Sequence, residues 1–134
     1  MSPRFLLDTH IVVRWLAAPK KLSTEQARVL REALRRREPV AVSAVTLLEL
    51  AVLFGQGSTR SKIPVDQLFG KLESSPAFEV IPITVDVASE VAALGGWLRD
   101  PADRAIVATA RLRGLRLLTS DQRIIESALV PVVA

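Results

Sequence analysis

The 134-residue sequence contains no cysteine and only one histidine, His10. The absence of cysteine excludes disulfides, a thiol nucleophile and a zinc site made of thiolates. A single histidine cannot form a histidine-rich metal site either. Any metal ion bound by this chain would therefore need oxygen ligands.

Long apolar runs are also missing. The apolar stretch Phe5–Leu7 ends at Asp8, which makes it shorter than the apolar centre of a signal peptide. The run 39–48 ends at Glu49, far below the roughly 20 residues that a membrane helix requires. We therefore expect a cytoplasmic protein with no membrane partner.

The composition is that of a folded globular chain. Apolar residues make up 49% of the sequence, which is enough to bury a core and argues against disorder. At roughly 150 residues per domain, the length predicts a single domain over residues 1–134.

The charge balance is basic and rich in arginine. Eighteen Lys and Arg residues face 14 Asp and Glu residues, a net charge of +4, and 14 of the cations are Arg. The planar fork of Arg suits phosphate and carboxylate groups, so the balance favours a nucleic-acid or acidic protein partner. A solvated basic surface explains it equally well. The same two interpretations hold for the stripe Arg28, Arg31 and Arg35 on one predicted helix.

Short apolar strands alternate with helices along the chain. Strands are predicted at 5–7, 40–43, 80–83, 115–118 and 130–133, and Pro82 indicates an edge position for the third. Helices are predicted at 9–17, after Ser23, and at 44–54, 65–72, 84–94, 101–113 and shortly after 121. The helix after Ser23 opens with a capping box and is expected to bury Ala27, Leu30, Ala33 and Leu34. A loop is expected at 55–64. The alternation predicts an α/β fold with a mainly parallel sheet.

Four acids follow these strands or lie at a helix start. Asp8 and Asp121 come directly after strands, Glu49 lies just beyond another, and Asp103 is in the first turn of helix 101–113. Ligands bind parallel sheets at the carboxyl ends of the strands, so the acids are expected to meet there. Capping or helix-dipole roles would explain the three aspartates individually. Neither role explains Glu49. Its helix is so apolar that we expect most of it to be buried, and a buried carboxylate is unfavourable without a partner.

Carboxylates gathered at one place repel one another and need a compensating charge. With neither cysteine nor a second histidine available, the natural candidate is a hard cation such as Mg²⁺, with Mn²⁺ possible. Acids holding one or two such ions can cleave phosphodiesters, so the residues themselves already point to a metal-dependent nuclease.

Four blocks of the sequence resemble the PIN-domain nucleases, and most closely the VapC-type toxins of bacterial toxin–antitoxin pairs. The blocks are Leu-Leu-Asp-Thr-His at 6–10, Ser-Ala-Val-Thr-Leu-Leu-Glu-Leu at 43–50, Asp-Pro-Ala-Asp-Arg-Ala-Ile-Val-Ala-Thr-Ala at 100–110, and Leu-Leu-Thr-Ser-Asp at 117–121. They occur in the order and spacing of the family and cover nearly the whole chain. The sequence departs from the family at Ala102, where an aromatic residue is common.

The resemblance implies a three-layer α/β/α sandwich and an Mg²⁺- or Mn²⁺-dependent endoribonuclease that acts as a toxin. Its metal-binding and catalytic acids map onto Asp8, Glu49, Asp103 and Asp121, and its polar residue near the metal maps onto Thr119, with Ser120 beside it. It also implies a homodimer that is inhibited by a cognate antitoxin and acts on RNA.

Further residues are candidates for supporting roles: Thr9, Ser43 and Arg104, with His10 a weaker candidate for proton transfer. Asp100 is interpreted as a helix cap. Two other functions stay open. One is a PIN-like module that binds RNA or protein without catalysis. The other is a phosphatase-like domain with Asp8 as nucleophile, although His10 stands where that class has a second aspartate.

Overall fold

The computed structural model describes residues 2–55 and 63–134. Its strands form one parallel sheet in the order β3-β2-β1-β4-β5. The strands are β1 (Phe5–Leu7), β2 (Val40–Ser43), β3 (Phe78–Ile81), β4 (Arg116–Leu118) and β5 (Val132–Val133). Most of the predicted loop 55–64 lies outside the described residues.

Seven α-helices and one short 3-10 helix, η1, connect the strands within these ranges. They are α1 (Thr9–Ala17), η1 (Pro19–Lys21), α2 (Thr24–Arg35), α3 (Ala44–Phe54), α4 (Val65–Ser74), α5 (Val85–Ala93), α6 (Pro101–Arg113) and α7 (Gln122–Ser127). No helix in the described part is long and apolar enough to span a bilayer.

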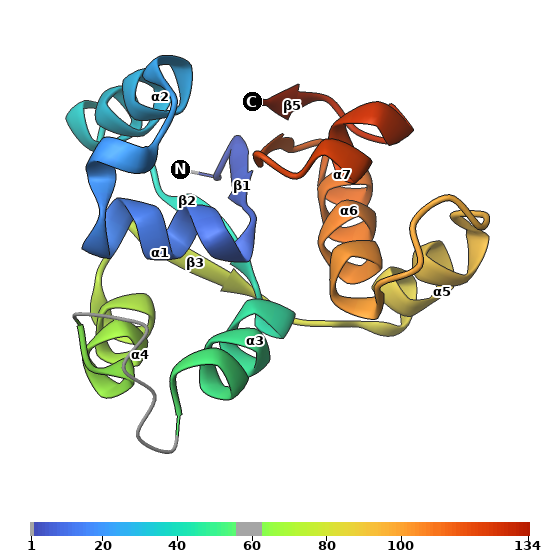
Figure 1. Ribbon diagram of the computed structural model, residues 1–134, viewed down its shortest axis with the longest axis horizontal. Helices are drawn as coiled ribbons and strands as arrows, with labels where there is room; N and C mark the ends of the chain where they lie inside the picture. The colour runs from blue at the N-terminus through green and yellow to red at the C-terminus, as the bar shows by residue number, and fades with distance from the viewer. Residues whose placement is uncertain (1, 56–62) are drawn as a thin grey trace.

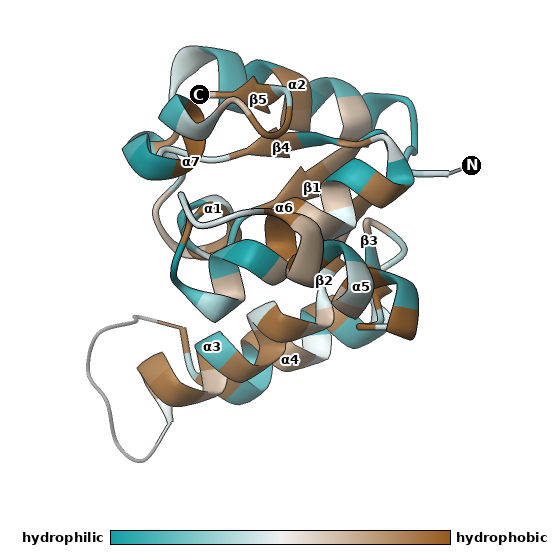
Figure 2. Ribbon diagram, turned by 90° about the vertical axis from the view of Figure 1, so that its right-hand side faces the viewer, coloured by the Kyte–Doolittle hydropathy of each residue, from teal (hydrophilic) through white to brown (hydrophobic). Residues whose placement is uncertain are grey.

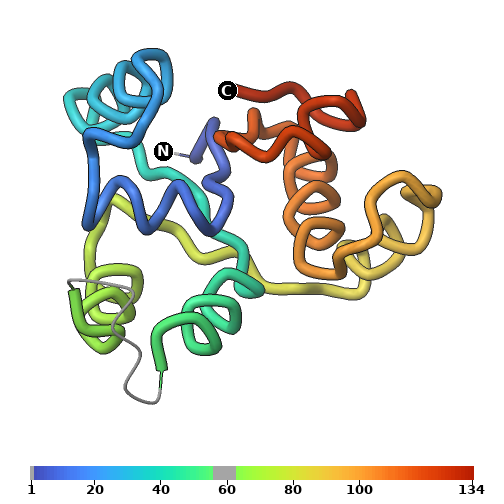
Figure 3. Tube along the Cα trace, viewed as in Figure 1, coloured from blue at the N-terminus to red at the C-terminus, as the bar shows by residue number. Residues whose placement is uncertain are grey.

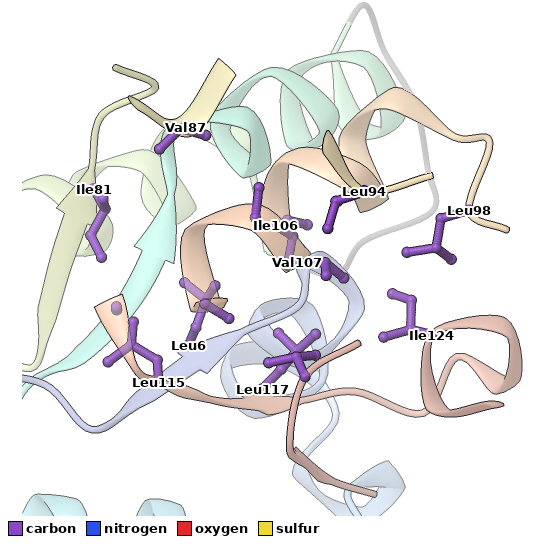
Figure 4. Packing of buried hydrophobic residues seen from close by; sticks show 14 residues of the cluster. Leu6, Ile81, Val87, Leu94, Leu98, Ile106, Val107, Leu115, Leu117 and Ile124 are labelled. Atoms are coloured by element: carbon purple, nitrogen blue, oxygen red, sulfur yellow. The ribbon is translucent and has the colours of Figure 1, made fainter. Parts of the chain in front are cut away.

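The helices cover both faces of the sheet, which gives three layers (Figure 1). Successive side chains on a strand point to opposite faces. Accordingly, Leu6 belongs to one buried cluster, with Ile106 of α6 and Ile124 of α7 (Figure 4), while Leu7 belongs to the other, with Ile11 of α1. Figure 2 shows β1 and β4 mostly in the hydrophobic colour, as expected of strands buried on both faces. The predicted α/β/α sandwich with a parallel sheet is confirmed.

Local signals in the sequence set most helix boundaries. Both hydrogen bonds of the capping box between Ser23 and Gln26 are present at the start of α2. Asp100 caps α6 with Pro101 in its first turn, and Gly114 ends that helix in the left-handed conformation at φ 64°. The predicted bounds of α1, β2 and α3 are also confirmed.

Three structural expectations need correction. Helix α2 buries Gln26, Val29, Leu30 and Ala33, while Leu34 is 52% exposed, so the buried face is rotated from the predicted one. Strand β3 ends at Ile81, so Pro82 follows the strand; it is an edge strand as expected. Helix α3 buries only Thr46 and Leu50, and its outer side is exposed to solvent. Its apolar composition therefore does not reflect complete burial.

The register of the sheet brings its carboxyl ends together. Leu7 of β1 pairs with Val42 of β2 and with Leu118 of β4. The residues that follow these strands therefore emerge side by side at one edge. After α4, the chain runs through β3 and crosses to α5 on the other face of the sheet (Figure 3).

Candidate active site

One cavity of about 550 Å³ lies at this edge, and we call it the edge cavity. All four predicted acids line it, although they come from β1–α1, α3, α6 and β4–α7. The complete lining is Asp8, Thr9, His10, Val13, Arg14, Ala17, Ala18, Lys21, Glu49, Leu53, Phe54, Asp103 and Asp121. The topology thus brings together acids separated by up to 113 positions, from 8 to 121.

Asp8 is the most buried of the four acids, at 4% exposure. Its Oδ1 accepts from the backbone N–H of Thr9 at 2.8 Å, which caps α1. Its Oδ2 accepts from the hydroxyl of Thr119 at 2.7 Å and lies 3.5 Å from Nδ1 of His10. Capping and a place in the cavity are therefore compatible for this residue.

Glu49 enters the cavity from α3 and is held by a hydroxyl. Oγ1 of Thr9 donates to Glu49 Oε1 and lies 3.0 Å from Oγ1 of Thr46. Partial burial raises the pKa of Glu49, and the charges of Asp8 and Asp100 add to the effect, against the hydrogen bond from Thr9.

Asp103 has the most perturbed titration at the site. Burial raises its pKa to about 7, with further contributions from the charges of Asp100, Asp8, Asp121 and Glu49. Asp100 itself accepts from the backbone N–H of Asp103 at 3.0 Å, which confirms its capping role. Asp103 therefore lies close enough to the other three acids of the cavity to be repelled by their charges.

The segment 119–121 is bound to α1 from several sides. Asp121 caps α7 by accepting from the N–H of Arg123 at 2.9 Å, and its own N–H donates to Oγ1 of Thr119 at 3.0 Å. The N–H of Ser120 donates to Nε2 of His10 at 2.9 Å. Nε2 is therefore an acceptor, which leaves Nδ1–H directed at Asp8. Burial lowers the pKa of His10, which favours this neutral form.

Of the predicted supporting residues, only Thr9 lines the cavity; Thr119 and Ser120 lie behind it with the contacts described above, and Ser43 and Arg104 act on other elements. Ser43 is buried, and its hydroxyl accepts from the N–H of Val45 at 3.2 Å to cap α3. Arg104 donates to three backbone carbonyls, those of Gly95, Leu98 and Val91. Both residues stabilise the elements that carry Glu49 and Asp103.

The arginine stripe of α2 is largely occupied by its own helix. Arg28 pairs with Glu25 and Arg35 with Glu32, each one turn away. These pairs favour the interpretation of the stripe as a solvated helix face.

The sequence predicted only a capping role for Gln26 and did not single out Arg14 and Lys21. Gln26 is fully buried, and its Nε2 donates to the carbonyls of Thr119 and Val133 at 3.2 and 3.1 Å. Arg14 and Lys21 line the edge cavity beside the acids. The spacing of His10 and Arg14, four residues apart on α1, is the signal that could have placed Arg14 there.

The donor set suits a hard divalent cation. The four acids offer only oxygen ligands. Burial raises the pKa values of Asp103 and Glu49, and the charges of neighbouring acids raise them further, so a cation there would relieve an unfavourable concentration of negative charge. Within residues 2–55 and 63–134, no group of three or more Asp, Glu or His side chains is placed so that it could hold an ion as it stands. The acids share a cavity without converging on one point.

A parallel α/β sandwich with these acids at its carboxyl edge is the architecture of a PIN domain. The PIN domain family model matches residues 5–128, and the chain belongs to this family. The sequence is 36% identical over 120 residues to Ribonuclease VapC22 of Mycobacterium tuberculosis (strain ATCC 25618 / H37Rv), covering 89% of this chain and 88% of the relative.

Solved structures share the fold over almost the entire chain. FitAcB from Neisseria gonorrhoeae superposes with a TM-score of 0.71 at 25% identity, covering 97% of this chain and 96% of the other. VapBC-5 from Mycobacterium tuberculosis, a member of the VapBC family of toxin–antitoxin systems, gives 0.60 at 25% identity, covering 98% of each chain. VapBC2 from Rickettsia felis, bound to a promoter DNA fragment, gives 0.70 at 19% identity with 96% coverage of each chain, a likeness of fold alone.

Proposed function

We propose that this chain is a VapC-type endoribonuclease, the toxin of a toxin–antitoxin pair, which hydrolyses phosphodiester bonds of unpaired RNA in the cytoplasm. The observation that carries the proposal is the meeting of Asp8, Glu49, Asp103 and Asp121 in one cavity at the carboxyl edge of the sheet. The relationship to Ribonuclease VapC22 supports the activity.

In this proposal the four acids are the catalytic residues and would hold Mg²⁺ or Mn²⁺. When bound, such a cation supplies charge neutralisation at the phosphate and activation of water. Thr9 and Thr119 orient Glu49 and Asp8 through their hydroxyls, and Ser120 ties the segment that carries Asp121 to His10. Ser43 and Arg104 fix the helices behind them.

A cognate antitoxin and a homodimer belong to the same proposal. The VapBC-5 neighbour, a member of a family of toxin–antitoxin systems, is consistent with an antitoxin partner. On α3, Leu48 and Val52 are 64% and 75% exposed, which leaves apolar surface for a protein to cover.

The test is cleavage of a labelled single-stranded RNA with Mg²⁺ or Mn²⁺, and with EDTA. Wild type should cleave only with metal and leave 5′-phosphate and 3′-hydroxyl ends, because water attacks and the 3′ oxygen leaves. Asp8→Asn should reduce cleavage by at least about 100-fold and stay folded, whereas Asp66→Asn on the exposed start of α4 should cleave normally. Cleavage by Asp8→Asn at the wild-type rate, or RNA binding with no cleavage by wild type, would reject the proposal.

A further inference from the structure

The edge cavity extends beyond the acids along α1. Its lining continues from Thr9 through Val13 to Ala17, and from His10 to Arg14, two rows with a spacing of four residues. Such rows share one face of a helix, while Ile11 and Val12 are buried on the opposite side. The cavity therefore follows the helix for about 12 Å, at 1.5 Å per residue, from the acids toward Lys21.

This extension carries positive charge. Arg14 and Lys21 both line it, and in the described part of the chain neither forms an ion pair, in contrast to Arg28 and Arg35 on α2. Arg14 lies nearer the acids, because its Nη1 donates to Oγ of Ser120 at 3.1 Å, next to Asp121. Between Arg14 and Lys21 the lining is formed by the small side chains of Ala17 and Ala18.

The facing part of the lining is apolar. Leu53 and Phe54 come from the last turn of α3, which contacts α1. Leu53 is 37% exposed, while Phe54 is half-buried, lining the cavity and also packing against the core. A cationic side opposite an aromatic ring is typical of sites for single-stranded nucleic acid, where cations follow the phosphates and rings stack on bases. Bases inside a duplex cannot reach such a ring.

We infer that this extension is the path of an unpaired RNA strand, in which Arg14 and Lys21 hold phosphates next to the scissile one and Phe54 stacks on a base. The inference rests on the proposed function and adds to it the course of the unpaired strand along α1 and the residues that hold its phosphates and a base. An acidic centre repels a polyanion, so cations beside it offset that repulsion and bring the phosphodiester to the acids.

The test is fluorescence anisotropy of a labelled 12-nucleotide unpaired RNA in EDTA, where binding is measured without cleavage. Lys21→Gln should weaken binding several-fold and lower the slope of log Kd against log salt by about 0.7, the value for one phosphate contact on a single strand. Phe54→Ala should weaken binding by about ten-fold or more with the slope unchanged. Lys21→Arg should bind like wild type.

Matched controls are available for both changes. Lys20→Gln removes the same charge one position away, outside the cavity lining, and Val52→Ala truncates an exposed apolar residue of α3. Affinities of Lys21→Gln and Phe54→Ala equal to those of these controls would overturn the inference and point to a groove for a protein segment. Equal weakening of an RNA duplex by Phe54→Ala would also overturn it. Failure of the proposed function looks different, since wild type would then not cleave in Mg²⁺ whatever these affinities are.

Discussion

Thr119 and Asp8 are 111 positions apart in the sequence, yet Thr119 Oγ1 donates to Asp8 Oδ2 at 2.7 Å. The same hydroxyl accepts from the backbone N–H of Asp121 at 3.0 Å. One buried side chain thereby fixes two of the four acids relative to each other, and it does so at the ends of the neighbouring strands β1 and β4.

Replacing Thr119 should therefore affect both stability and cleavage. Thr119→Val keeps the shape but leaves the buried Asp8 oxygen and the Asp121 N–H without this partner, a loss of about 1–3 kcal/mol in the free energy of unfolding. Thr119→Ser retains the hydroxyl and should recover most of the cleavage rate. Urea unfolding and RNA cleavage would be compared for the two variants. Equal rates for Val and Ser would show that the hydroxyl does not position the acids.

Asp103 should make the stability of the metal-free protein depend on pH. Its folded-state pKa, about 7, lies above the ordinary value of 3.8, so between these values the folded state keeps a proton that the unfolded chain has lost. The free energy of unfolding should therefore fall as pH rises from about 4 to 7, and the loss should be complete above pH 7. Asp103→Asn removes this dependence and should raise Tm by a few degrees at pH 8.

The control for this experiment is Asp86→Asn. Asp86 also lies in the first turn of a helix, α5, and is exposed, so it lacks the neighbouring acids of the edge cavity. Thermal unfolding at pH 5 and pH 8 would be compared for both variants. Parallel pH dependence of wild type and Asp103→Asn would mean that neither burial nor the neighbouring acids raise the pKa of Asp103. Adding Mg²⁺ at pH 8 should stabilise wild type more than Asp103→Asn.

Local chemistry made much of the fold predictable from the sequence. Helix caps act within one turn of the chain, so they could be predicted without knowing which distant segments pack against the helix. Examples are the capping box at Ser23, the pair Asp100–Pro101 and Gly114. The positions of Asp8 and Asp121 just after strands also predicted that both lie at one edge, because parallel strands all end there.

The remaining features depend on contacts between distant segments. Gln26 is buried because its amide meets carbonyls of Thr119 and Val133, over 90 positions away, and this rotates the buried face of α2 away from Leu34. Glu49 was predicted to be functional because its apolar helix was expected to be buried, but the outer side of that helix is exposed. Its place in the cavity depends instead on Thr9, 40 positions earlier.

Gln26 should act as a positioning residue for the acids. Its Nε2 also lies 3.3 Å from Oγ of Ser120, so it supports the segment 119–121 from the side of α2. Gln26→Leu keeps a similar volume but leaves two buried carbonyls without this donor, which should cost about 3 kcal/mol of stability. Gln67→Leu, on an exposed position of α4, should cost almost nothing. The kcat of the folded fraction of Gln26→Leu should also fall. A kcat equal to that of wild type would mean that Gln26 contributes to folding only.

Substitutions of Arg104 can distinguish between two roles of its guanidinium, stabilising the fold and contacting RNA. Its guanidinium donates to the carbonyls of Gly95, Leu98 and Val91, which ties residues 91–98 to the helix that carries Asp103. Arg104→Ala should lower the free energy of unfolding by about 2–3 kcal/mol, since hydrogen bonds from a charged donor are lost, and Arg104→Lys should recover little because an ammonium lacks the planar fork. Arg99→Ala, at an exposed position nearby, is the control.

The affinity of these variants for unpaired RNA in EDTA decides between the two roles of Arg104. Because its three donor contacts are directed to backbone carbonyls, Arg104→Lys should bind the oligonucleotide as tightly as wild type, with the same salt dependence, at a temperature where both are folded. A loss of affinity accompanied by a smaller salt slope would instead mean that the guanidinium leaves its carbonyls to hold a phosphate.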